Sequence, residues 1–259
     1  MNRFRLGAVV ALAVSAALAG VAPRAQGSAE VHKFSLIISA IPTSIDGGSL
    51  NTTIKYFNDT QLTPKGLEGL SEIQFGWMFD AELHYFVRPN VAVGVGVGQI
   101  RGETQREFLP ALSQDIQIRA ELLSVPIHAG LDYYFTPYNQ GDFQARAYVG
   151  GGILSLTNTY GKTATVNSTT VNPGVFTGRY AGDAPGWYTE AGAHMFFAVR
   201  YSVMLGAIYR SAVVQSVGVY SNLVNGVPVY PDERLQQANY AYKLDTSGLG
   251  ARLSLGIGF

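Results

Sequence analysis

The last thirteen residues of the chain, 247–259, restrict its fold more than any other stretch. Apolar residues alternate there with small or polar ones without interruption, which is the pattern of a β-strand whose two faces meet different surroundings. The apolar face consists of Leu249, Ala251, Leu253, Leu255, Ile257 and Phe259. The opposite face consists of Gly248, Gly250, Arg252, Ser254, Gly256 and Gly258. Such a strand fits the edge of a soluble sandwich or the wall of a membrane barrel, and the rest of the chain decides between them.

The same alternation recurs in seven earlier segments, so the sequence predicts an all-β protein with eight strands. The eight segments are 31–42, 71–87, 91–101, 118–135, 143–156, 186–199, 202–215 and 247–259. In the fourth segment, Arg119 and Glu121 have the opposite phase to the residues that follow, which predicts a bulge near Leu122 and puts both charges on the inner face. Pro126 in the same segment has no N–H to donate and is tolerable only at a bulge or at a weak position in the ladder.

Long and short connections alternate between these segments. The long connections are 43–70, 102–117, 157–185 and 216–242, and the short ones are 88–90, 136–142 and 200–201. An even number of antiparallel strands with long loops at one end and tight turns at the other is typical of outer-membrane β-barrels. We therefore predict an eight-stranded antiparallel transmembrane β-barrel with an up-and-down meander, since only a closed sheet leaves no unpaired edge in lipid.

The N-terminal stretch has the three parts of a secretory signal peptide. Arg3 and Arg5 supply positive charge, residues 6–18 are uncharged and apolar, and residues 25–27 form a small-x-small cleavage signal. We expect residues 1–27 to be removed and residues 28–259 to form one barrel domain. The alternative, a membrane anchor, would need about 20 apolar residues.

The composition of the remaining chain agrees with a membrane barrel and excludes other classes. Without residues 1–27 it has 15 basic and 18 acidic residues, a net charge of −3, so it offers no basic surface for nucleic acid. It has no cysteine, which excludes lipoprotein attachment and disulfide bonds. No apolar run downstream of the signal reaches 18 residues, although 47% of all residues are hydrophobic and 30 are glycine.

Aromatic residues gather near the ends of the predicted strands, as in the interfacial belts of membrane proteins. Those near the short-turn end are Tyr85, Phe86, Tyr133, Tyr134, Phe135, Phe196, Phe197, Tyr201 and Phe259. Trp77, Trp187 and Tyr209 are candidates for a belt at the opposite end.

Eight strands, four long loops, inward glycines and a terminal phenylalanine together resemble the small outer-membrane β-barrel superfamily that includes the OmpA membrane domain, OmpX and OmpW. In such barrels the terminal Phe closes the barrel and is recognised by the outer-membrane assembly machinery. The resemblance implies that Phe259, Ile257 and Leu255 form a C-terminal assembly signal in this chain. It also implies the outer membrane of a Gram-negative bacterium, with both termini in the periplasm.

The inner faces of the predicted strands carry charges, which in a narrow barrel must pair or be hydrated. The candidates for a lumen charge network are Asp80, Glu82, Glu121, Arg146, Glu190, Arg210 and Arg252. One hypothesis is a permanent ion-pair network that plugs the lumen. The other is a gate for small solutes, in which the three arginines exchange partners among the carboxylates.

Neither a catalytic site nor a cofactor site is predicted. Lipid A-modifying barrels resembling this one in size need His, Ser and an acid within reach of lipid, whereas His84, His128 and His194 face inward. Their positions on separate strands do not form a metal-ligand signature. The motif Gly94-x-Gly96-x-Gly98 precedes no helix, so it does not indicate a phosphate loop.

We therefore expect a non-enzymatic barrel that supports the envelope or contacts other surfaces through four extracellular loops. The alternative is a narrow channel or carrier for small molecules, hydrophobic ones included, and a lipid A-modifying enzyme is a third hypothesis. The expected partners are outer-membrane lipids and lipopolysaccharide, the assembly machinery, and a host surface or small-molecule ligand, but no nucleic acid.

Overall fold

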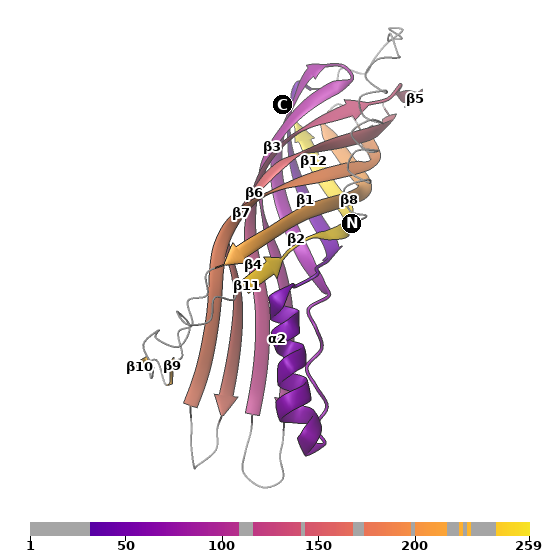
Figure 1. Cartoon of the computed structure of the whole chain (residues 1–259). Helices are drawn as coiled ribbons and strands as arrows, with labels where there is room; N and C mark the ends of the chain where they lie inside the picture. The colour runs from indigo at the N-terminus through magenta and orange to yellow at the C-terminus, as the bar shows by residue number, and fades with distance from the viewer. Residues whose placement is uncertain are drawn as a thin grey trace, which may run out of the picture.

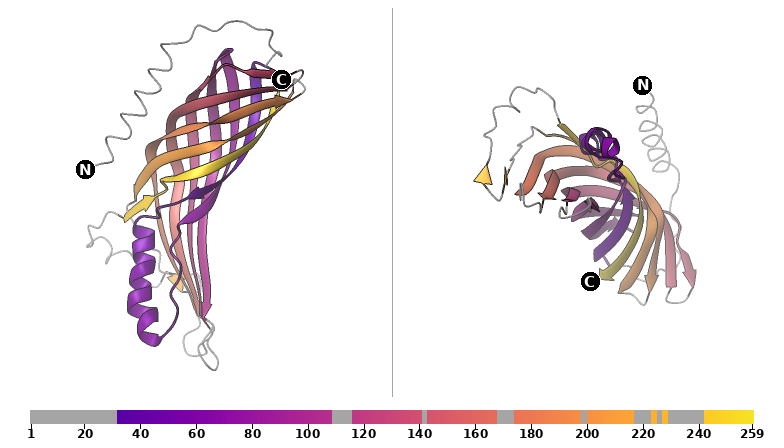
Figure 2. Two further views of the ribbon diagram at one scale, coloured as in Figure 1. Left: turned by 90° about the vertical axis from the view of Figure 1, so that its right-hand side faces the viewer. Right: turned by 90° about the horizontal axis from the view of Figure 1, so that it is seen from below.

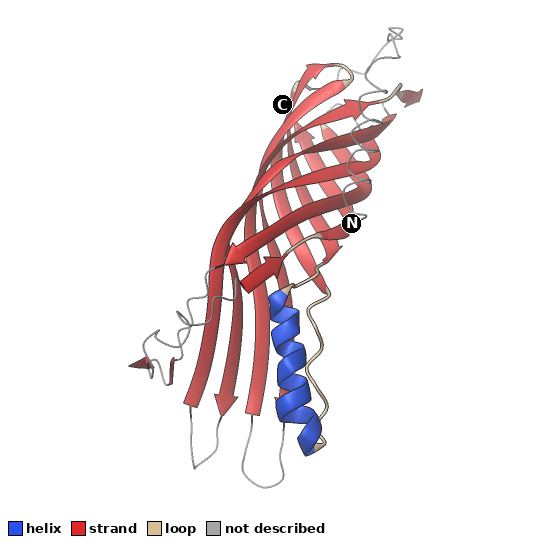
Figure 3. Cartoon of the chain, viewed as in Figure 1, coloured by secondary structure: helices blue, strands red, loops and turns tan. Residues whose placement is uncertain are grey.

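A computed structural model describes residues 32–108, 116–140, 143–167, 174–197, 200–216, 223–224, 227–228 and 242–259. The predicted signal peptide, 1–27, lies outside these residues. Within them, strands dominate and one α-helix is present (Figure 3).

Eight antiparallel strands pair in chain order and close on themselves, which confirms the predicted barrel (Figure 1). They are β1 (Phe34–Ser44), β2 (Phe75–Arg88), β3 (Val91–Phe108), β4 (Ile116–Tyr134), β6 (Phe143–Asn167), β7 (Gly174–Phe197), β8 (Tyr201–Ser216) and β12 (Gly248–Gly258). The last strand joins the ring between β8 and β1, with Leu255 opposite Ile38 on one side and Val203 on the other. Seen along its length, the sheet curves around a common interior (Figure 2).

Four short strands among the described residues lie outside the ring. They are β5 (Tyr138–Gln140), β9 (Leu223–Val224), β10 (Val227–Pro228) and β11 (Tyr242–Asp245). β5 pairs with the start of β6 at the short-turn end, and β11 pairs with the opposite end of β8.

The apolar faces of the strands point outward and are exposed, as a barrel in lipid requires. Exposed apolar residues on this outer face include Ile38, Phe79, Val95, Ile127, Leu131, Ile153, Leu205, Leu253 and Leu255. On β2 exposed apolar residues run from Phe75 to Val87, and the aromatic residues toward the two ends of this band, Phe75 and Tyr85, are ten residues apart. At about 3.3 Å per residue and a tilt near 40°, that length spans about 25 Å, the height of the apolar band of outer-membrane barrels. The fold is a transmembrane β-barrel.

Aromatic residues flank the band, although not all the predicted ones face lipid. Phe34, Tyr85, Phe135, Phe197, Tyr201 and Phe259 are exposed at the short-turn end, and Trp77, Trp187 and Tyr209 are exposed toward the other. Phe86 and Tyr134 are instead buried inside the barrel, with Phe196 packed against them. Each is adjacent in sequence to an outward aromatic, so the two-residue period of the strand turns it inward.

Two hairpins project well beyond the lipid band, where we expected loops. Most of 102–117 and 157–185 continues as strand, so β3, β4, β6 and β7 have 18, 19, 25 and 24 residues (Figure 1). The loop prediction was wrong because the outer faces of these strands turn polar where lipid ends, while backbone pairing continues. A strand whose outer face meets water carries polar residues there without losing its ladder hydrogen bonds.

The predicted loop 43–70 contains helix α2 (Ser49–Phe57), followed by a π-helical turn, η1 (Asn58–Leu62), and a 3-10 turn, η2 (Thr63–Lys65). Leu50 and Ile54 on one face of α2 are buried in an apolar cluster with residues from the projecting strands. The Asn51 side chain accepts a hydrogen bond from the Ile73 N–H (2.8 Å) and donates one to the Ile73 carbonyl (2.9 Å). Among the described residues, no helix is long and apolar enough to cross a membrane.

The predicted bulge near Leu122 exists in the β4–β6 ladder, but its extra residue lies on β6. The register shifts between Leu123 and Val125 on β4, opposite Tyr160 and Thr157 on β6. β4 therefore keeps one phase throughout, with Ile118, Ala120, Leu122 and Ser124 buried. The inward placement of Arg119 and Glu121 was wrong for this reason.

Pro126 lies where the β3–β4 ladder is interrupted. Going outward from the short turns, the paired residues of β3 and β4 end at Val97–Ile127 and begin again at Ile100–Ser124. A proline, which cannot donate to a ladder, is accommodated at such a break.

Candidate functional site

The candidate site is the middle layer of the barrel interior, where charged side chains from β2, β4, β7 and β12 meet. Every second side chain of a strand points to the same face, so Asp80, Glu82 and His84 of β2 all point inward. The same holds for His128 and Asp132 of β4. β3 lies between these two strands and contributes only Gly94, Gly96 and Gly98 at the matching levels. The glycines leave the space above β3 free for side chains from its neighbours.

Arg252 on β12 is the centre of this layer. Its Nη2 donates to Glu82 Oε2 at 2.6 Å, and its Nη1 donates to Glu190 Oε2 on β7. Its Nε also lies within hydrogen-bonding distance of Ser39 Oγ (3.3 Å) and Ser254 Oγ (3.1 Å). All these side chains are at most 5% exposed, so the arginine joins opposite walls of the barrel through buried ion pairs.

Two histidines complete the layer. His84 Nε2 lies 2.7 Å from Glu82 Oε1 and 3.3 Å from Asp132 Oδ2. His128 Nε2 lies 2.9 Å from Asp80 Oδ1, and its ring contacts Tyr188 edge-on at a centroid distance of 5.4 Å. The Nδ1 atoms of both histidines are buried without a hydrogen-bond partner among the described residues.

The layer nearer the short turns is filled mainly by apolar and aromatic side chains. Its buried members are Ile37, Phe86, Ala92, Tyr134, Tyr148 and Met204. Arg146 lies at this end, where it donates to Gln144 Oε1 at 2.7 Å and to the Pro89 carbonyl. Its guanidinium also lies over the Phe196 ring at 5.8 Å. Arg146 therefore closes the short-turn opening and takes no part in the central ion pairs.

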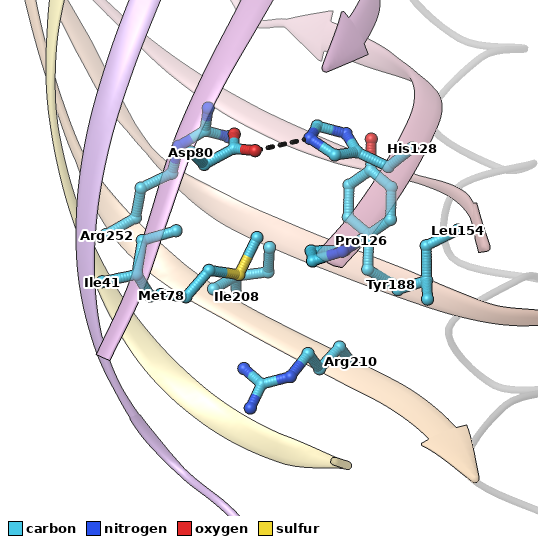
Figure 4. A pocket seen from close by; sticks show the side chains of 10 residues that line it. All are labelled: Ile41, Met78, Asp80, Pro126, His128, Leu154, Tyr188, Ile208, Arg210 and Arg252. Atoms are coloured by element: carbon cyan, nitrogen blue, oxygen red, sulfur yellow. Dashed lines mark hydrogen bonds and ion pairs between the residues drawn. The ribbon is translucent and has the colours of Figure 1, made fainter. Parts of the chain in front are cut away.

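On the other side of the central layer lies a cavity of about 20 Å³, enough for little more than one water molecule (Figure 4). It is lined by Ile41, Met78, Asp80, Pro126, His128, Leu154, Tyr188, Ile208, Arg210 and Arg252. Arg210 donates to Thr43 Oγ1 (2.6 Å) and to the Ser44 carbonyl (3.2 Å). Beyond it, the apolar cluster under α2 fills the interior of the projecting strands.

The structure brings together four of the seven predicted network residues and separates the other three. Asp80, Glu82, Glu190 and Arg252 share the central layer, whereas Arg146 and Arg210 lie inside the barrel toward opposite ends. Glu121 is not in the lumen. It faces outward beside Arg101 (3.2 Å) and Arg119 (3.7 Å), and Arg119 also pairs with Glu103 at 2.9 Å.

His84, His128 and Asp132 belong to the central layer but were not predicted as network members. Their inward phase was readable from the alternation on β2 and β4. What the sequence did not reveal is the barrel register, which puts His84 of β2 level with Gly94 of β3 and Gly130 of β4. That register brings His84 and Asp132 together across β3.

The three residues of the predicted C-terminal signal all face outward. Leu255, Ile257 and Phe259 are 66%, 51% and 65% exposed. Phe259 stacks on Phe34 with ring centroids 6.4 Å apart, and its N–H donates to the Phe34 carbonyl at 3.0 Å. The terminal aromatic thus fastens the last strand to the first.

No family model and no curated protein matches this sequence. Solved structures that align with it include Neisserial surface protein A, at 10% identity over 88% of this chain and 97% of that chain, with a TM-score of 0.41. The N-terminal β-barrel domain of Pseudomonas aeruginosa OprF aligns at 12% identity over 89% and 100%, with a TM-score of 0.38. Ail, the attachment invasion locus protein of Yersinia pestis, aligns at 11% identity over 88% and 98%, with a TM-score of 0.34. At these values no residue role is transferred, and the fold rests on the strand pairing itself.

Proposed function

We propose that this chain is an outer-membrane barrel protein with a closed lumen, without enzymatic activity, that acts through the part projecting beyond the lipid band. In this proposal the short turns and both termini face the periplasm, and the projecting hairpins and α2 face the outside of the cell. The expected partners are lipopolysaccharide and, through the projecting part, another surface.

The observation that carries the proposal is the filling of the interior. Aromatic, ionic and apolar layers follow one another from the short turns to α2, and the cavity between the second and third is only about 20 Å³. An eight-stranded barrel is narrow enough for side chains to fill it in this way. A continuous path for solutes would require several buried ion pairs and packed side chains to separate.

The projecting part supports a role outside the membrane. The β6–β7 pairing runs from Phe143–Phe197 to Asn167–Gly174, far longer than a crossing of the bilayer needs. The segment that carries α2 packs Leu50, Ile54, Leu62 and Leu70 in one apolar cluster with Ile118, Ala120 and Leu122 of the projecting part of β4. Such a supported extension fits surface contact better than it fits a lipid-embedded role.

The outward position of Leu255, Ile257 and Phe259 is compatible with recognition by the assembly machinery while the last strand is still unpaired. Their exposure also fits direct contact with lipid afterwards.

Conductance in planar lipid bilayers tests the closed lumen. The wild-type protein is expected to show no steady conductance. Arg252→Ala leaves Glu82 and Glu190 without their cation and is expected to admit water and ions, because unpaired buried carboxylates must be hydrated. Arg101→Ala, outside the lumen, is the matched control and is expected to stay silent. A steady conductance of the wild type would contradict the proposal and favour the channel.

A further inference from the structure

The central layer carries more negative charge than its cations balance. Four buried carboxylates, Asp80, Glu82, Asp132 and Glu190, surround the single guanidinium of Arg252. With neutral imidazoles, three negative charges remain uncompensated among the described residues of this layer. Buried charges are stable only when they are paired or coordinate a metal ion. The layer therefore needs further neutralisation, either by protons bound to its histidines or carboxylates or by a cation.

Three donor atoms in this layer already converge on one point. His84 Nε2 lies 2.7 Å from Glu82 Oε1 and 3.3 Å from Asp132 Oδ2, and the three donor atoms all lie within 4.8 Å of one another. Ligand atoms about 2.1 Å from one tetrahedral ion lie about 3.4 Å apart, so the His84–Asp132 distance already fits and the Glu82–His84 distance must lengthen by about 0.7 Å. His84 is the one hydrogen-bond or ion-pair partner of Asp132 among the described residues.

The neighbouring groups leave these donor atoms available. Arg252 binds the other oxygen of Glu82, Oε2, and so orients the carboxylate with Oε1 toward His84. A second group, Asp80, Glu82 and His128, shares Glu82 with the first. His84 contacts both carboxylates of its group, whereas among the described residues His128 pairs only with Asp80, at 2.9 Å. The first group is thus the better site.

Glycines make the space in which the donors meet. A Cβ at Gly94 would lie 1.9 Å from Glu82 Oε1, and a Cβ at Gly150 would lie 1.8 Å from Asp132 Oδ1. Any larger residue on β3 or β6 at these levels would push a carboxylate away from His84. Because Gly94, Gly96 and Gly98 leave the inner face of β3 without side chains at these levels, side chains of β2 reach those of β4 across it.

We propose that Glu82, His84 and Asp132 bind one divalent transition-metal ion of the Zn²⁺ class inside the barrel. An imidazole nitrogen with two carboxylate oxygens is a donor set that such ions accept, and a water molecule completes four-coordination. The ion links β2 to β4, two strands that do not pair with each other. Because packed layers enclose the site on both sides, the ion enters as the barrel closes.

The test refolds the mature chain from urea into detergent micelles with Zn²⁺, removes free metal with a chelator, and measures zinc per chain by mass spectrometry. About one zinc per wild-type chain is expected, with at least a tenfold loss in Asp132→Asn and His84→Gln. Asp80→Asn and Glu121→Gln, which change carboxylates outside the triad, are the matched controls and are expected to retain zinc. Heat-modifiable migration on gels establishes that each variant is folded.

Replacing Zn²⁺ by Co²⁺ gives a second readout that needs no variant. The wild type is expected to acquire the visible absorption of four-coordinate Co²⁺. The proposal is overturned if the folded wild type retains no metal, if it shows no such absorption, or if folded Asp132→Asn binds as much zinc as wild type. Loss of zinc in Asp80→Asn but not in Asp132→Asn would overturn the assignment to this triad. None of these results bears on whether the lumen conducts, so the closed-lumen proposal is tested separately.

Discussion

At the scale of single residues, Arg252 links two walls of the barrel interior through buried ion pairs. It is 4% exposed and pairs with carboxylates on β2 and β7. The inward phase of Arg252, Glu82 and Glu190 could be predicted from the alternation of their strands. Their mutual contacts could not, because β12, β2 and β7 are distant in sequence and meet only through the closed register. Glu121 was misplaced because beyond the lipid band the outer face of β4 is polar and its inner face packs in the apolar cluster, so the two faces exchange character without a bulge in β4.

Arg252→Met is expected to lower the free energy of unfolding by about 3–5 kcal/mol, because it leaves two buried carboxylates without their partner. Urea unfolding in detergent micelles, followed by circular dichroism, measures this change. Arg101→Met removes a half-exposed arginine from the outer ion pairs and is expected to change the free energy by about 0–1 kcal/mol. Equal effects of the two substitutions would show that the central pairs contribute no more than surface pairs.

At the scale of elements, the membrane-spanning parts of the strands could be predicted and the parts outside lipid could not. Lipid on one side and a packed lumen on the other impose a two-residue period on strands such as β2 and β12. Beyond the lipid band that constraint ends, so the outer parts of β3, β6 and β7 read as polar loops. The helix α2 was missed for a similar reason. Only Leu50 and Ile54 mark its buried face, within a stretch rich in Asn and Thr.

Leu50→Ala is expected to loosen α2 without unfolding the barrel, because the cavity left in the apolar cluster costs about 2–5 kcal/mol locally. Lys55 on the exposed face of α2 reports this opening through limited trypsin digestion. Cleavage after Lys55 is expected to accelerate about tenfold or more, since about 1.4 kcal/mol of lost local stability raises the open population tenfold.

Tyr56→Ala, which removes a 69% exposed side chain from the same helix, is the matched control and is expected to leave the rate unchanged. If Leu50→Ala is cleaved after Lys55 no faster than this control, the packing of α2 on the projecting strands does not hold it in place.

At the scale of the whole molecule, closure converts eight weakly patterned strands into a cylinder with an apolar exterior and a filled interior. Closure was predictable from the sequence. In lipid, the backbone N–H and C=O groups of the two edge strands find hydrogen-bond partners only when an even number of strands with apolar outer faces closes into a barrel. The layered filling was not, because aromatic residues such as Phe86 and Tyr134 lie at the level of a lipid belt and yet turn inward. The closed lumen and the metal site both depend on which face of each strand points outward and which points into the barrel.

Tryptophan fluorescence tests that assignment most directly, because the chain has two tryptophans and both lie on the outer face. Trp77 and Trp187 are 46% and 42% exposed. In vesicles whose lipids carry bromine on the acyl chains, the fluorescence of the folded protein is expected to fall by about half or more relative to unbrominated vesicles, since both rings lie at the edge of the apolar band. Unchanged fluorescence in the folded, membrane-inserted protein would contradict the assignment of the apolar face to lipid.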